Sequence, residues 1–411
     1  MAVVTVEEAL QLWDEALQTQ VHKVEMIDVK AAKGYVLAED IIAPTDVPAF
    51  PKSAMDGYAI TYKADCNEYI VDGIIGAGVV WEYPVETGHA VRIMTGAPVP
   101  DTCDTVIMQE QVVGSGEPGT TITIQGKYTC GDHIISQGEE CSAGTTVIPR
   151  GTEITSTVQT ILTGLGFTEI NVNAMPRVLV LTSGHEVIEP GESLTPGKIY
   201  NSNRAMICGL LEDLGFQKIT HYHVSDSLEA LDSEIDRVLK LSENADIIIS
   251  SGGVSVGLFD TMPLIYEKLG AKSIYARIQM RPGAASYGAV TPKGQIIFGL
   301  SGNPGAAFNG WHLIVAPTLK RYKGLANWTT PVVACVMDSE IFKRNAFDRY
   351  VQGKVIFGGG VPRFVANRHF NSSSMLGLYT VNALACIPRG VHEVHPGDTF
   401  NVYLLGLLPA I

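Results

Sequence analysis

The sequence has no long apolar run and no excess of basic residues. No apolar stretch approaches the roughly 20 residues that a helix needs to cross a bilayer, so we expect no membrane-spanning segment. Its 29 Lys and Arg residues are outnumbered by 43 Asp and Glu, which gives a formal net charge of -14. That charge argues against a nucleic acid or an anionic membrane as the partner. An anionic ligand would have to be bound by local groups whose attraction exceeds the repulsion from the negative net charge of the protein.

The sequence also lacks a paired-cysteine motif. Its seven cysteines are scattered, and no two are spaced as Cys-x-x-Cys. An odd number without such spacing argues against a disulfide framework and a cysteine zinc site, and it indicates reduced thiols in a cytoplasmic protein. The first ten residues have no basic segment before an apolar stretch, so no secretory signal peptide is expected.

What the sequence does contain is ordinary globular material for several domains. The chain has 411 residues, of which 46% are hydrophobic and 18% charged, and at about 100–200 residues per domain it predicts two to four domains. Thr5, followed three residues later by Glu8, predicts a capping box that opens a helix. Residues 41–149 are rich in Gly, Pro and short alternating runs, which predicts a β-rich region with strands near 105–113 and 120–126.

From residue 176 to 323 apolar strands alternate with helices. This alternation predicts a parallel sheet covered by helices on both faces. After residue 323 the alternation stops and short strands predict a small all-β domain. The middle region has expected strands at 177–184, 216–224, 245–250 and 295–300, and expected helices at 201–215, 225–241, 261–270 and 303–319. The last region has expected strands at 331–337, 350–357, 363–367, 383–388 and 399–405.

Three strands of the middle region end in turns of small residues, VLTSGHE, ISSGGVSVG and GLSGNPG. Ligands of open α/β sheets bind at the carboxyl ends of the strands, where Gly admits close approach and free N–H groups favour anions. A single such turn is more often only a tight connection, but three together predict a phosphate-bearing ligand. None of these three turns is a P-loop, because no Gly-Lys-[Ser/Thr] follows, and GGVSVG does not match GxGxxG. The residues assigned to this ligand site are Thr182, Ser183, Gly184, Ser250, Ser251, Gly252, Gly253, Val254, Ser255, Ser301, Gly302 and Asn303.

Asp260 follows the second of these turns. A carboxylate beside a phosphate is unfavourable unless a cation lies between them, and Mg²⁺ is the usual one. An N-cap of the following helix explains Asp260 equally well. His221 and His223 alternate on a predicted strand and therefore face the same side. Without a third ligand, a hydrogen-bonded pair is favoured over a metal site for these two histidines.

Five separated segments carry a resemblance to a known family. They are SAMDGYA, RIMTGAPVP, VIMQEQ, SSGGVSVG and GNP, in that order along the chain. Together they resemble the molybdopterin molybdenumtransferase family, known as MoeA in bacteria and as the gephyrin E domain in animals. The resemblance covers essentially the whole chain.

The resemblance implies a multidomain α/β plus β fold. It comprises a MogA-like three-layer α/β/α domain, β-rich N-terminal subdomains and a C-terminal β-barrel. It also implies a homodimer with the active site between protomers, and a molybdopterin adenylyltransferase is the candidate protein partner. The expected domains are a helical and β subdomain at 1–53 and 143–175, a β-rich subdomain at 54–142, the molybdopterin-binding domain at 176–323 and the barrel at 324–411.

The activity that the resemblance implies is insertion of molybdate into adenylylated molybdopterin, with Mg²⁺ and release of AMP. Asp56, Asp260 and Arg281 would be catalytic, and Asp260, Asp56 and Glu140 would hold the metal. Asn201 and Arg204 would join the ligand site. As an oxyanion, molybdate would need basic groups, for which Arg281 and Arg204 are the candidates.

The sequence departs from the family pattern at several of these positions. The family's Tyr-Asp-[Ser/Thr]-Asn-Arg segment has Asn201 here, and its Lys-Pro-Gly-Lys-Pro segment has Arg281 and Ala284. His185 stands where the family has Asp or Ser. Three hypotheses therefore stay open: an active insertase for molybdate or tungstate, a non-catalytic molybdopterin-binding scaffold, and an adenylyltransferase that acts on molybdopterin itself.

Overall fold

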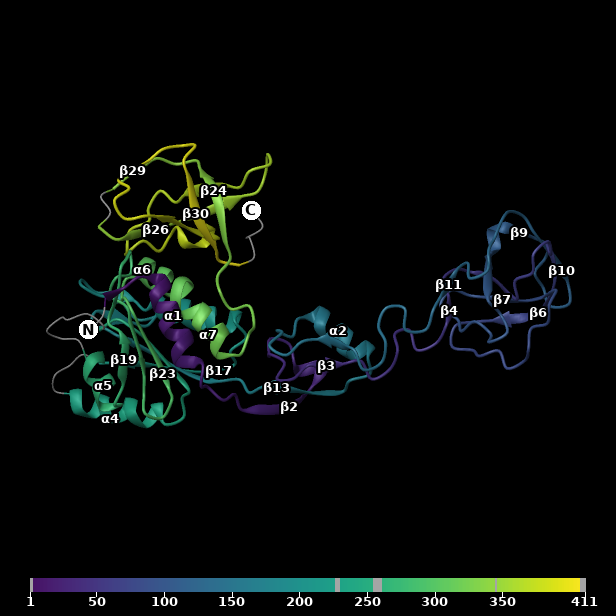
Figure 1. Cartoon of the computed structure of the whole chain (residues 1–411). Helices are drawn as coiled ribbons and strands as arrows, with labels where there is room; N and C mark the ends of the chain where they lie inside the picture. Colours follow the sequence, from purple (N-terminus) through teal and green to yellow (C-terminus); the bar gives the residue numbers. More distant parts are fainter. Residues whose placement is uncertain (1–2, 226–229, 254–260, 344–345, 407–411) are drawn as a thin grey trace. The chain divides into compact units, whose positions relative to one another are not determined.

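The computed structural model describes residues 3–225, 230–253, 261–343 and 346–406 (Figure 1). Val254, Ser255 and Asp260, which we assigned to the site, lie outside the described residues. The chain divides into two compact units, each described here by itself. The first unit comprises Met1–Ala38, Gly151–Thr160 and Thr168–Ile411, and the second comprises Glu39–Arg150 and Ile161–Phe167. No helix in the described part of the chain is long and apolar enough to cross a membrane.

A six-stranded sheet forms the centre of the first unit. Four adjacent strands are parallel, as predicted, but the next strand, β22, is antiparallel to both of its neighbours, β23 and β19. The turn between Thr291 and Gln295 causes this difference, because a short turn joins only antiparallel neighbours. In spatial order the strands are β17 (Lys218–Val224), β14 (Arg177–Ser183), β18 (Ile247–Ser251), β23 (Ile296–Leu300), β22 (Tyr287–Val290) and β19 (Lys272–Tyr275).

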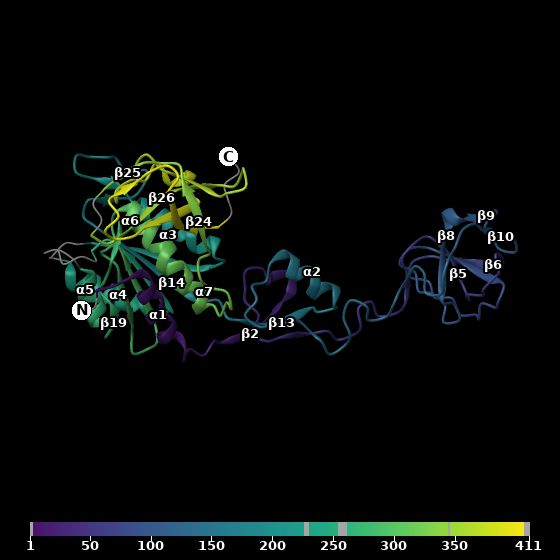
Figure 2. The ribbon, with the colours of Figure 1, turned by 45° about the horizontal axis from the view of Figure 1, so that its top comes forward.

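Helices cover both faces of this sheet, which confirms the predicted three layers. Side chains of β18 alternate between two cores: Ile247 and Ile249 face one, and Ile248 faces the other. In Figures 1 and 2, α4 and α5 lie together on the opposite side of the sheet from α1 and α7. One layer contains α1 (Val6–Leu17), α3 (Ser202–Asp213), α6 (Pro304–Gly310), the π-helical turn η3 (Trp311–Val315) and α7 (Ala316–Tyr322), and the other contains α4 (Leu231–Ser242) and α5 (Met262–Lys268).

The segment from Val3 to Leu17 packs against this part of the first unit. The capping box of α1 is confirmed, because the Thr5 N–H donates to Glu8 Oε2 at 2.8 Å and the Glu8 N–H donates to Thr5 Oγ1 at 3.1 Å. Trp13 is fully buried, and its ring centroid lies 4.7 Å from that of Phe298. The short strand β1 (Val3–Val4) pairs with β20 (Arg277–Ile278).

Five strands close a barrel in the C-terminal part of the first unit. Each strand neighbours the next, and the last pairs back onto the first. All five were predicted from the sequence, as was the barrel. A sixth strand, β21 (Met280–Arg281), pairs with the start of β26. In order around the ring the strands are β26 (Asp348–Ile356), β27 (Arg363–Ala366), β24 (Val332–Met337), β30 (Thr399–Leu404) and β28 (Ala383–Ile387).

The second unit is β-rich, as predicted. The single strand expected at 105–113 is broken by the 3-10 turn η2 (Gln109–Gln111), because the Gln109 N–H bonds the Asp56 carbonyl oxygen. Its main sheet contains, in spatial order, β8 (Thr105–Met108), β5 (Gly57–Ile60), β7 (His89–Ile93), β6 (Glu68–Ile75), β10 (Thr121–Ile124) and β9 (Val112–Val113). Smaller pairs are β3 (Ile41–Ile42) with β12 (Thr146–Ile148), and β4 (Lys52–Ser53) with β11 (Ile134–Ile135).

The remaining elements are short. The helix expected at 155–166 is α2 (Ser156–Gly164), which spans both units. In the first unit, β2 (Val24–Asp28) pairs with β13 (Glu169–Asn173), β15 (Val187–Ile188) with β16 (Ile199–Tyr200), and β25 (Ile341–Phe342) with β29 (Glu393–Val394).

Candidate functional site

The three glycine- and serine-rich turns lie side by side. Strands β14, β18 and β23 are adjacent and parallel, and their register places Thr182 opposite Ser251 and Ser251 opposite Leu300. The carboxyl ends of all three strands therefore meet at one edge of the sheet. We call this edge the strand-tip site; its described residues are Thr182, Ser183, Gly184, Ser251, Gly252, Gly253, Ser301, Gly302 and Asn303.

The turns approach one another so closely that glycine is required. Gly252 has a φ of +89°, and a Cβ atom there would lie 2.6 Å from the Ser183 carbonyl oxygen. Gly253 has a φ of +59°, and its Cβ would lie 2.7 Å from Ser183 Oγ. Side chains rarely adopt such φ angles, and atoms at these distances would overlap. The glycines therefore allow β14 and β18 to end in contact.

Two buried polar atoms at this site have no hydrogen-bond partner among the described residues. They are Ser183 Oγ and Asn203 Oδ1, on side chains that are 6% and 8% exposed. The amide nitrogen of Asn203 donates to Ser251 Oγ and to the Gly302 carbonyl oxygen, at 2.8 Å each. A buried polar atom without a partner costs about 1–3 kcal/mol, so the site is suited to a ligand that forms these bonds. Our sequence analysis assigned no role to Asn203, although it lies in the Tyr-Asp-[Ser/Thr]-Asn-Arg segment.

The two serines at the end of β18 face opposite sides. The Ser250 hydroxyl bonds the buried Tyr266 hydroxyl in the core beneath α5, whereas Ser251 Oγ contacts Asn203 and the Ser301 carbonyl oxygen. We had assigned both serines to the ligand. The strand alternation that separates them was readable in the sequence, because neighbouring side chains of a strand point to opposite faces.

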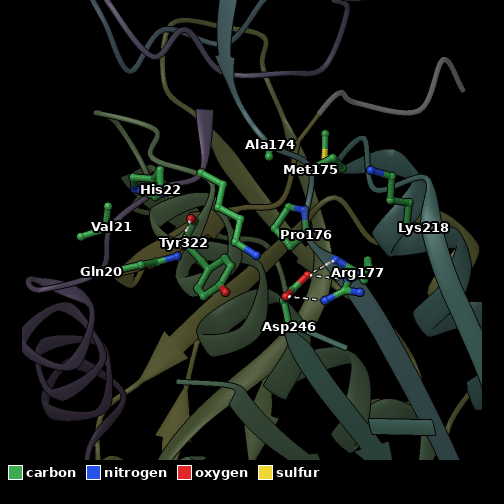
Figure 3. Close-up of a pocket in the computed structure, with 11 residues that line it drawn as sticks. Gln20, Val21, His22, Ala174, Met175, Pro176, Arg177, Lys218, Asp246 and Tyr322 are labelled. Atoms are coloured by element: carbon green, nitrogen blue, oxygen red, sulfur yellow. Dashed lines mark hydrogen bonds and ion pairs between the residues drawn. The ribbon is translucent and has the colours of Figure 1, made fainter. Parts of the chain in front are cut away.

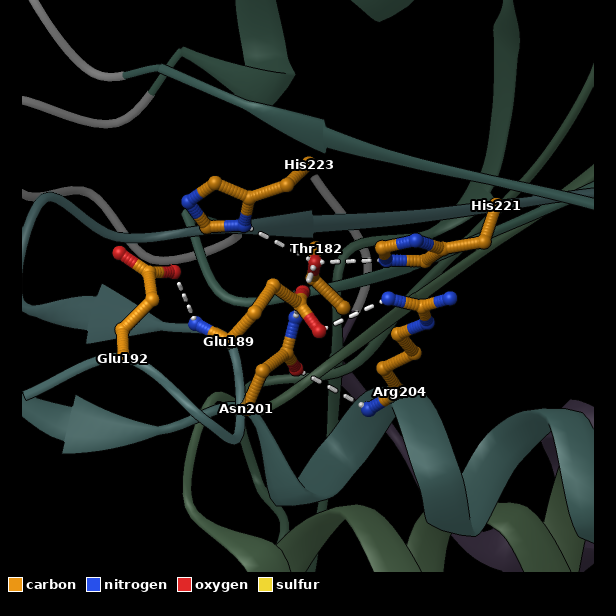
Figure 4. Close-up of polar contacts among 7 residues, drawn as sticks. All are labelled: Thr182, Glu189, Glu192, Asn201, Arg204, His221 and His223. Atoms are coloured by element: carbon orange, nitrogen blue, oxygen red, sulfur yellow. Dashed lines mark hydrogen bonds and ion pairs between the residues drawn. The ribbon is translucent and has the colours of Figure 1, made fainter.

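Thr182 is the centre of a polar cluster next to these turns (Figure 4). Its hydroxyl lies 3.0 Å from both His221 Nε2 and His223 Nδ1, and it accepts a hydrogen bond from Asn201 Nδ2 at 3.0 Å. The two histidines thus face the same side and are hydrogen-bonded. Burial, together with the charges of Arg204 and His223, lowers the pKa of His221 to about 4 despite the opposing charge of Glu189.

Arg281 belongs to a basic cluster that the sequence did not reveal. Strand pairing places it opposite Arg349, and its guanidinium lies 5.8 Å from the centroid of the Phe347 ring. Burial, and then the charge of Arg281, lower the pKa of Arg349. Burial, and then the charge of Arg349, likewise lower the pKa of Lys343, whose Nζ donates to Asn371 Oδ1 at 3.1 Å. Such mutually unfavourable cations favour an anion between them.

This basic cluster lies beside the strand-tip site. The Ala306 N–H, in the first turn of α6, bonds the carbonyl oxygens of both Asn303 and Ser372 at 3.1 Å. A Cβ atom at Gly283, two residues after Arg281, would lie 3.2 Å from the Ala306 carbonyl oxygen. The start of α6 therefore contacts the third turn on one side and the segment that follows Arg281 on the other.

The predicted metal site comprises three acidic residues, of which Asp260 lies outside the described residues. Asp56 and Glu140 belong to the second unit. Asp56 Oδ1 accepts hydrogen bonds from the N–H and the hydroxyl of Thr95, at 2.7 and 2.8 Å, and these bonds lower the pKa of Asp56. Glu140 is exposed. In the described ranges, no group of three or more His, Cys, Asp or Glu residues is placed to hold a metal ion.

A separate cavity of about 290 Å³ lies at the opposite end of β14 (Figure 3). Arg177 begins this strand and Ser183 ends it, so the cavity is one strand length away from the strand-tip site. Its best-defined contact is the pair between Arg177 and Asp246, in which the Arg177 N–H donates to Asp246 Oδ2 at 2.8 Å. We had assigned no function to this region.

Comparison with known proteins adds independent information. Residues 4–166 match the family model described as the MoeA N-terminal region (domain I and II). Residues 179–321 match the model of a probable molybdopterin binding domain.

Similar proteins cover nearly the full length of the chain. The molybdopterin molybdenumtransferase of Staphylococcus epidermidis is 34% identical over 92% of this chain and 90% of its own length. That of Staphylococcus aureus is 33% identical with the same coverage. The crystal structure of a molybdopterin biosynthesis moeA protein from Pyrococcus horikoshii superposes with a TM-score of 0.79 at 25% identity, over 98% of this chain and all of that one. The chain therefore belongs to the molybdopterin molybdenumtransferase family, MoeA.

Proposed function

We propose that this protein inserts molybdate into adenylylated molybdopterin and releases AMP, as a transferase of molybdenum cofactor biosynthesis. The observation that carries the proposal is the strand-tip site, where three parallel strands end together around two buried polar atoms without partners among the described residues. This site lies in the region that matches the molybdopterin-binding model. The relatives that are similar over nine-tenths of the chain are named as molybdenum transferases.

Each part of the site would have its own task. Glycine turns and Ser183 would receive the phosphates of the ligand through N–H and hydroxyl groups, which suit anions. The cluster of Arg281, Arg349 and Lys343 would bind molybdate, because neighbouring cations gain most from an oxyanion between them. Asn203 Oδ1 would accept a hydrogen bond from the ligand.

The carboxylates fit a magnesium ion by their chemistry. Asp260, Asp56 and Glu140 offer the hard oxygen donors that Mg²⁺ prefers, and the bonds from Thr95 keep Asp56 ionised. When bound, the ion supplies charge neutralisation and polarisation of a phosphoryl group. We infer that Asp56 and Glu140 come from one protomer of a homodimer and Asp260 from its partner.

Two further proposals concern the surroundings of the enzyme. All seven cysteines are free, which supports a location in the reducing cytoplasm. A molybdopterin adenylyltransferase is the proposed protein partner, because it would supply the adenylylated substrate.

The test is release of AMP. Purified protein is given adenylylated molybdopterin, Mg²⁺ and molybdate, and AMP is quantified, with tungstate in a parallel reaction. Arg281→Gln should reduce turnover at least tenfold, since a lost charged contact is worth about 1.5–3 kcal/mol. Lys272→Gln, an exposed lysine on the edge strand β19, should leave turnover within twofold of the parent. Absence of AMP with both oxyanions would contradict the proposal.

The other two hypotheses give different results in the same experiment. A non-catalytic scaffold would bind molybdopterin without releasing AMP; it is not favoured, because the relatives are named as enzymes. An adenylyltransferase would consume ATP in the presence of molybdopterin, and a reaction with ATP in place of the adenylylated substrate detects this.

A further inference from the structure

Asn201 uses every hydrogen-bonding group of its amide. It precedes α3, and its Oδ1 accepts the Arg204 N–H at 3.1 Å as a helix cap. Its Nδ2 donates to Thr182 Oγ1 and to Glu189 Oε1, both at 3.0 Å. The side chain is 4% exposed, so these contacts fix its orientation. Figure 4 shows the Asn201 amide directed towards Thr182 and Glu189.

Glu189 connects Asn201 to Arg204. Its Oε2 accepts from Arg204 Nη1 at 2.7 Å, while its Oε1 accepts from Asn201. Burial alone would raise the pKa of Glu189, but the hydrogen bonds from Asn201 and Arg204, with the charge of Arg204, lower it overall. The carboxylate is therefore ionised at neutral pH.

Local strand pairing places Glu189 at this position. In the parallel pair β15 and β16, Ile188 lies opposite Tyr200, so Glu189 and Asn201 are the next residues along. The Asn201 N–H bonds the Ile188 carbonyl oxygen at 2.9 Å.

Asn201 and Glu189 are matched as hydrogen-bond donor and acceptor. A carboxylate only accepts hydrogen bonds, so the group facing Glu189 must be a donor. An aspartate at 201 would still cap α3, but it would place a second negative charge where Asn201 Nδ2 now lies, 3.0 Å from Glu189 Oε1. With Asn201, the negative charge of Glu189 balances the positive charge of the Arg204 guanidinium, and position 201 adds no second carboxylate.

We propose that Glu189 is a positioning residue for Arg204 in ligand binding. It holds the Arg204 guanidinium beside the end of β14, where Arg204 binds an anionic group of the ligand. The Arg204 side chain is 47% exposed and thus accessible to such a group. This inference rests on the proposed function, because the anionic group is a phosphate of adenylylated molybdopterin.

Four variants test the proposal. Glu189→Gln and Asn201→Asp should each lower kcat/KM for AMP release about tenfold, because each disturbs a charge-assisted bond. The double variant E189Q/N201D exchanges donor and acceptor and should recover to within about threefold of the parent. Glu192→Gln is the matched control: Glu192 Oε1 accepts the Glu189 N–H in the same loop, and this variant should stay within about twofold.

Two measurements separate positioning from loss of structure. Melting temperatures of Glu189→Gln and Glu192→Gln should agree with that of the parent within about 3 °C, since an exposed ion pair contributes little stability. Crystal structures should show the Arg204 guanidinium displaced in Glu189→Gln and returned in the double variant. Neither the melting temperatures nor the crystal structures depend on turnover.

The results distinguish this inference from the proposed function. If the parent releases no AMP, the proposed function fails, and the inference is then judged by the position of Arg204 and by calorimetric affinity for molybdopterin across the same variants. Additive losses in the double variant would overturn the inference. An unmoved Arg204 in Glu189→Gln would also overturn it.

Discussion

Ser183 and Ser250 have the same side chain but opposite roles at neighbouring strand ends. Ser183 Oγ is buried without a partner among the described residues, whereas the Ser250 hydroxyl is bonded to Tyr266. An unpaired hydroxyl destabilises the free protein, and a paired one stabilises it. Ser183, where a ligand is expected, therefore lowers the stability of the free protein, and functional sites often give up stability in this way.

This contrast gives a paired prediction. Ser183→Ala should raise the melting temperature of the ligand-free protein, since it removes a hydroxyl that costs about 1–3 kcal/mol when unpaired. Ser250→Ala should lower it, because it leaves the Tyr266 hydroxyl unpaired. Calorimetry should show weaker molybdopterin binding for Ser183→Ala only. A lower melting temperature for Ser183→Ala would contradict this account.

His221 predicts how stability changes with pH. Burial lowers its folded-state pKa to about 4, below the ordinary value near 6.5, so folding favours the neutral ring. Its contribution is complete above pH 6.5 and is lost as the pH falls towards 4, because the unfolded chain then binds more protons. His221→Asn should flatten the fall in melting temperature between pH 6.5 and 4.5. The exposed His369→Asn should leave that fall unchanged.

Sequence reasoning found the residues of the strand-tip site and missed those that support it. Ser183 ends its strand and Gly252 directly follows the next one, so local pattern was enough to select them. Glu189 and Arg349 could not be selected in this way, because their roles come from the strand pairings that place them beside Asn201 and Arg281. Asn203 was missed because a helix start offers many polar residues, and only the fold shows which one faces the strands.

At the scale of elements, the close approach of β14 and β18 constrains Gly252 and Gly253, the first residues after β18. Gly252 needs both a positive φ and the absence of a Cβ atom. Gly294, in the turn between β22 and β23, has a similar φ of +81°, but a Cβ atom there would meet no atom of the described residues within 4 Å. A comparison of Gly252 with Gly294 therefore separates the free-energy cost of the positive φ angle from that of the close contact.

Gly252→Ala should therefore destabilise the protein more than Gly294→Ala. The φ angle costs about 1–2 kcal/mol in both, and the contact with the Ser183 carbonyl oxygen adds about 1–3 kcal/mol in Gly252→Ala alone. Denaturant unfolding measures the difference, and molybdopterin binding should be lost only in Gly252→Ala. Equal destabilisation of the two variants would show that the close contact is not limiting.

Elements with strong periodicity were predictable, and those fixed by distant partners were not. The helix that starts after Thr5 and the five barrel strands follow from pattern alone. The strands β19 and β22 were missed because each has only four residues and no clear alternation. The break at Gln109 depends on a bond to Asp56, about fifty residues earlier, which no local pattern contains.

At the scale of the whole molecule, the predicted catalytic carboxylates are distributed over two units. Asp56 lies in the second unit, and the strand-tip site lies in the first. A homodimer with shared active sites would combine the two from different protomers. In such a dimer two inactive variants can complement each other, which is impossible if each protomer holds a complete active site.

Mixing Asp56→Ala with Asp260→Ala tests this arrangement. After subunit exchange, half of the dimers are mixed and each holds one intact site of two, so about a quarter of the parent AMP release should return. Each variant alone, treated in the same way, should stay inactive. Failure to recover activity, with exchange verified by mass spectrometry, would contradict a site shared between protomers.

The burial of Trp13 bears on how the chain can be divided for study. A fragment that starts near residue 176 would keep the sheet and the barrel but lack Trp13, which would leave a cavity beside Phe298 and Tyr275. Removing so large an aromatic side chain from a core costs about 3–5 kcal/mol, a large share of the stability of a domain. A C-terminal fragment intended as an independent ligand-binding module therefore needs the first helix restored, by fusion or as an added peptide.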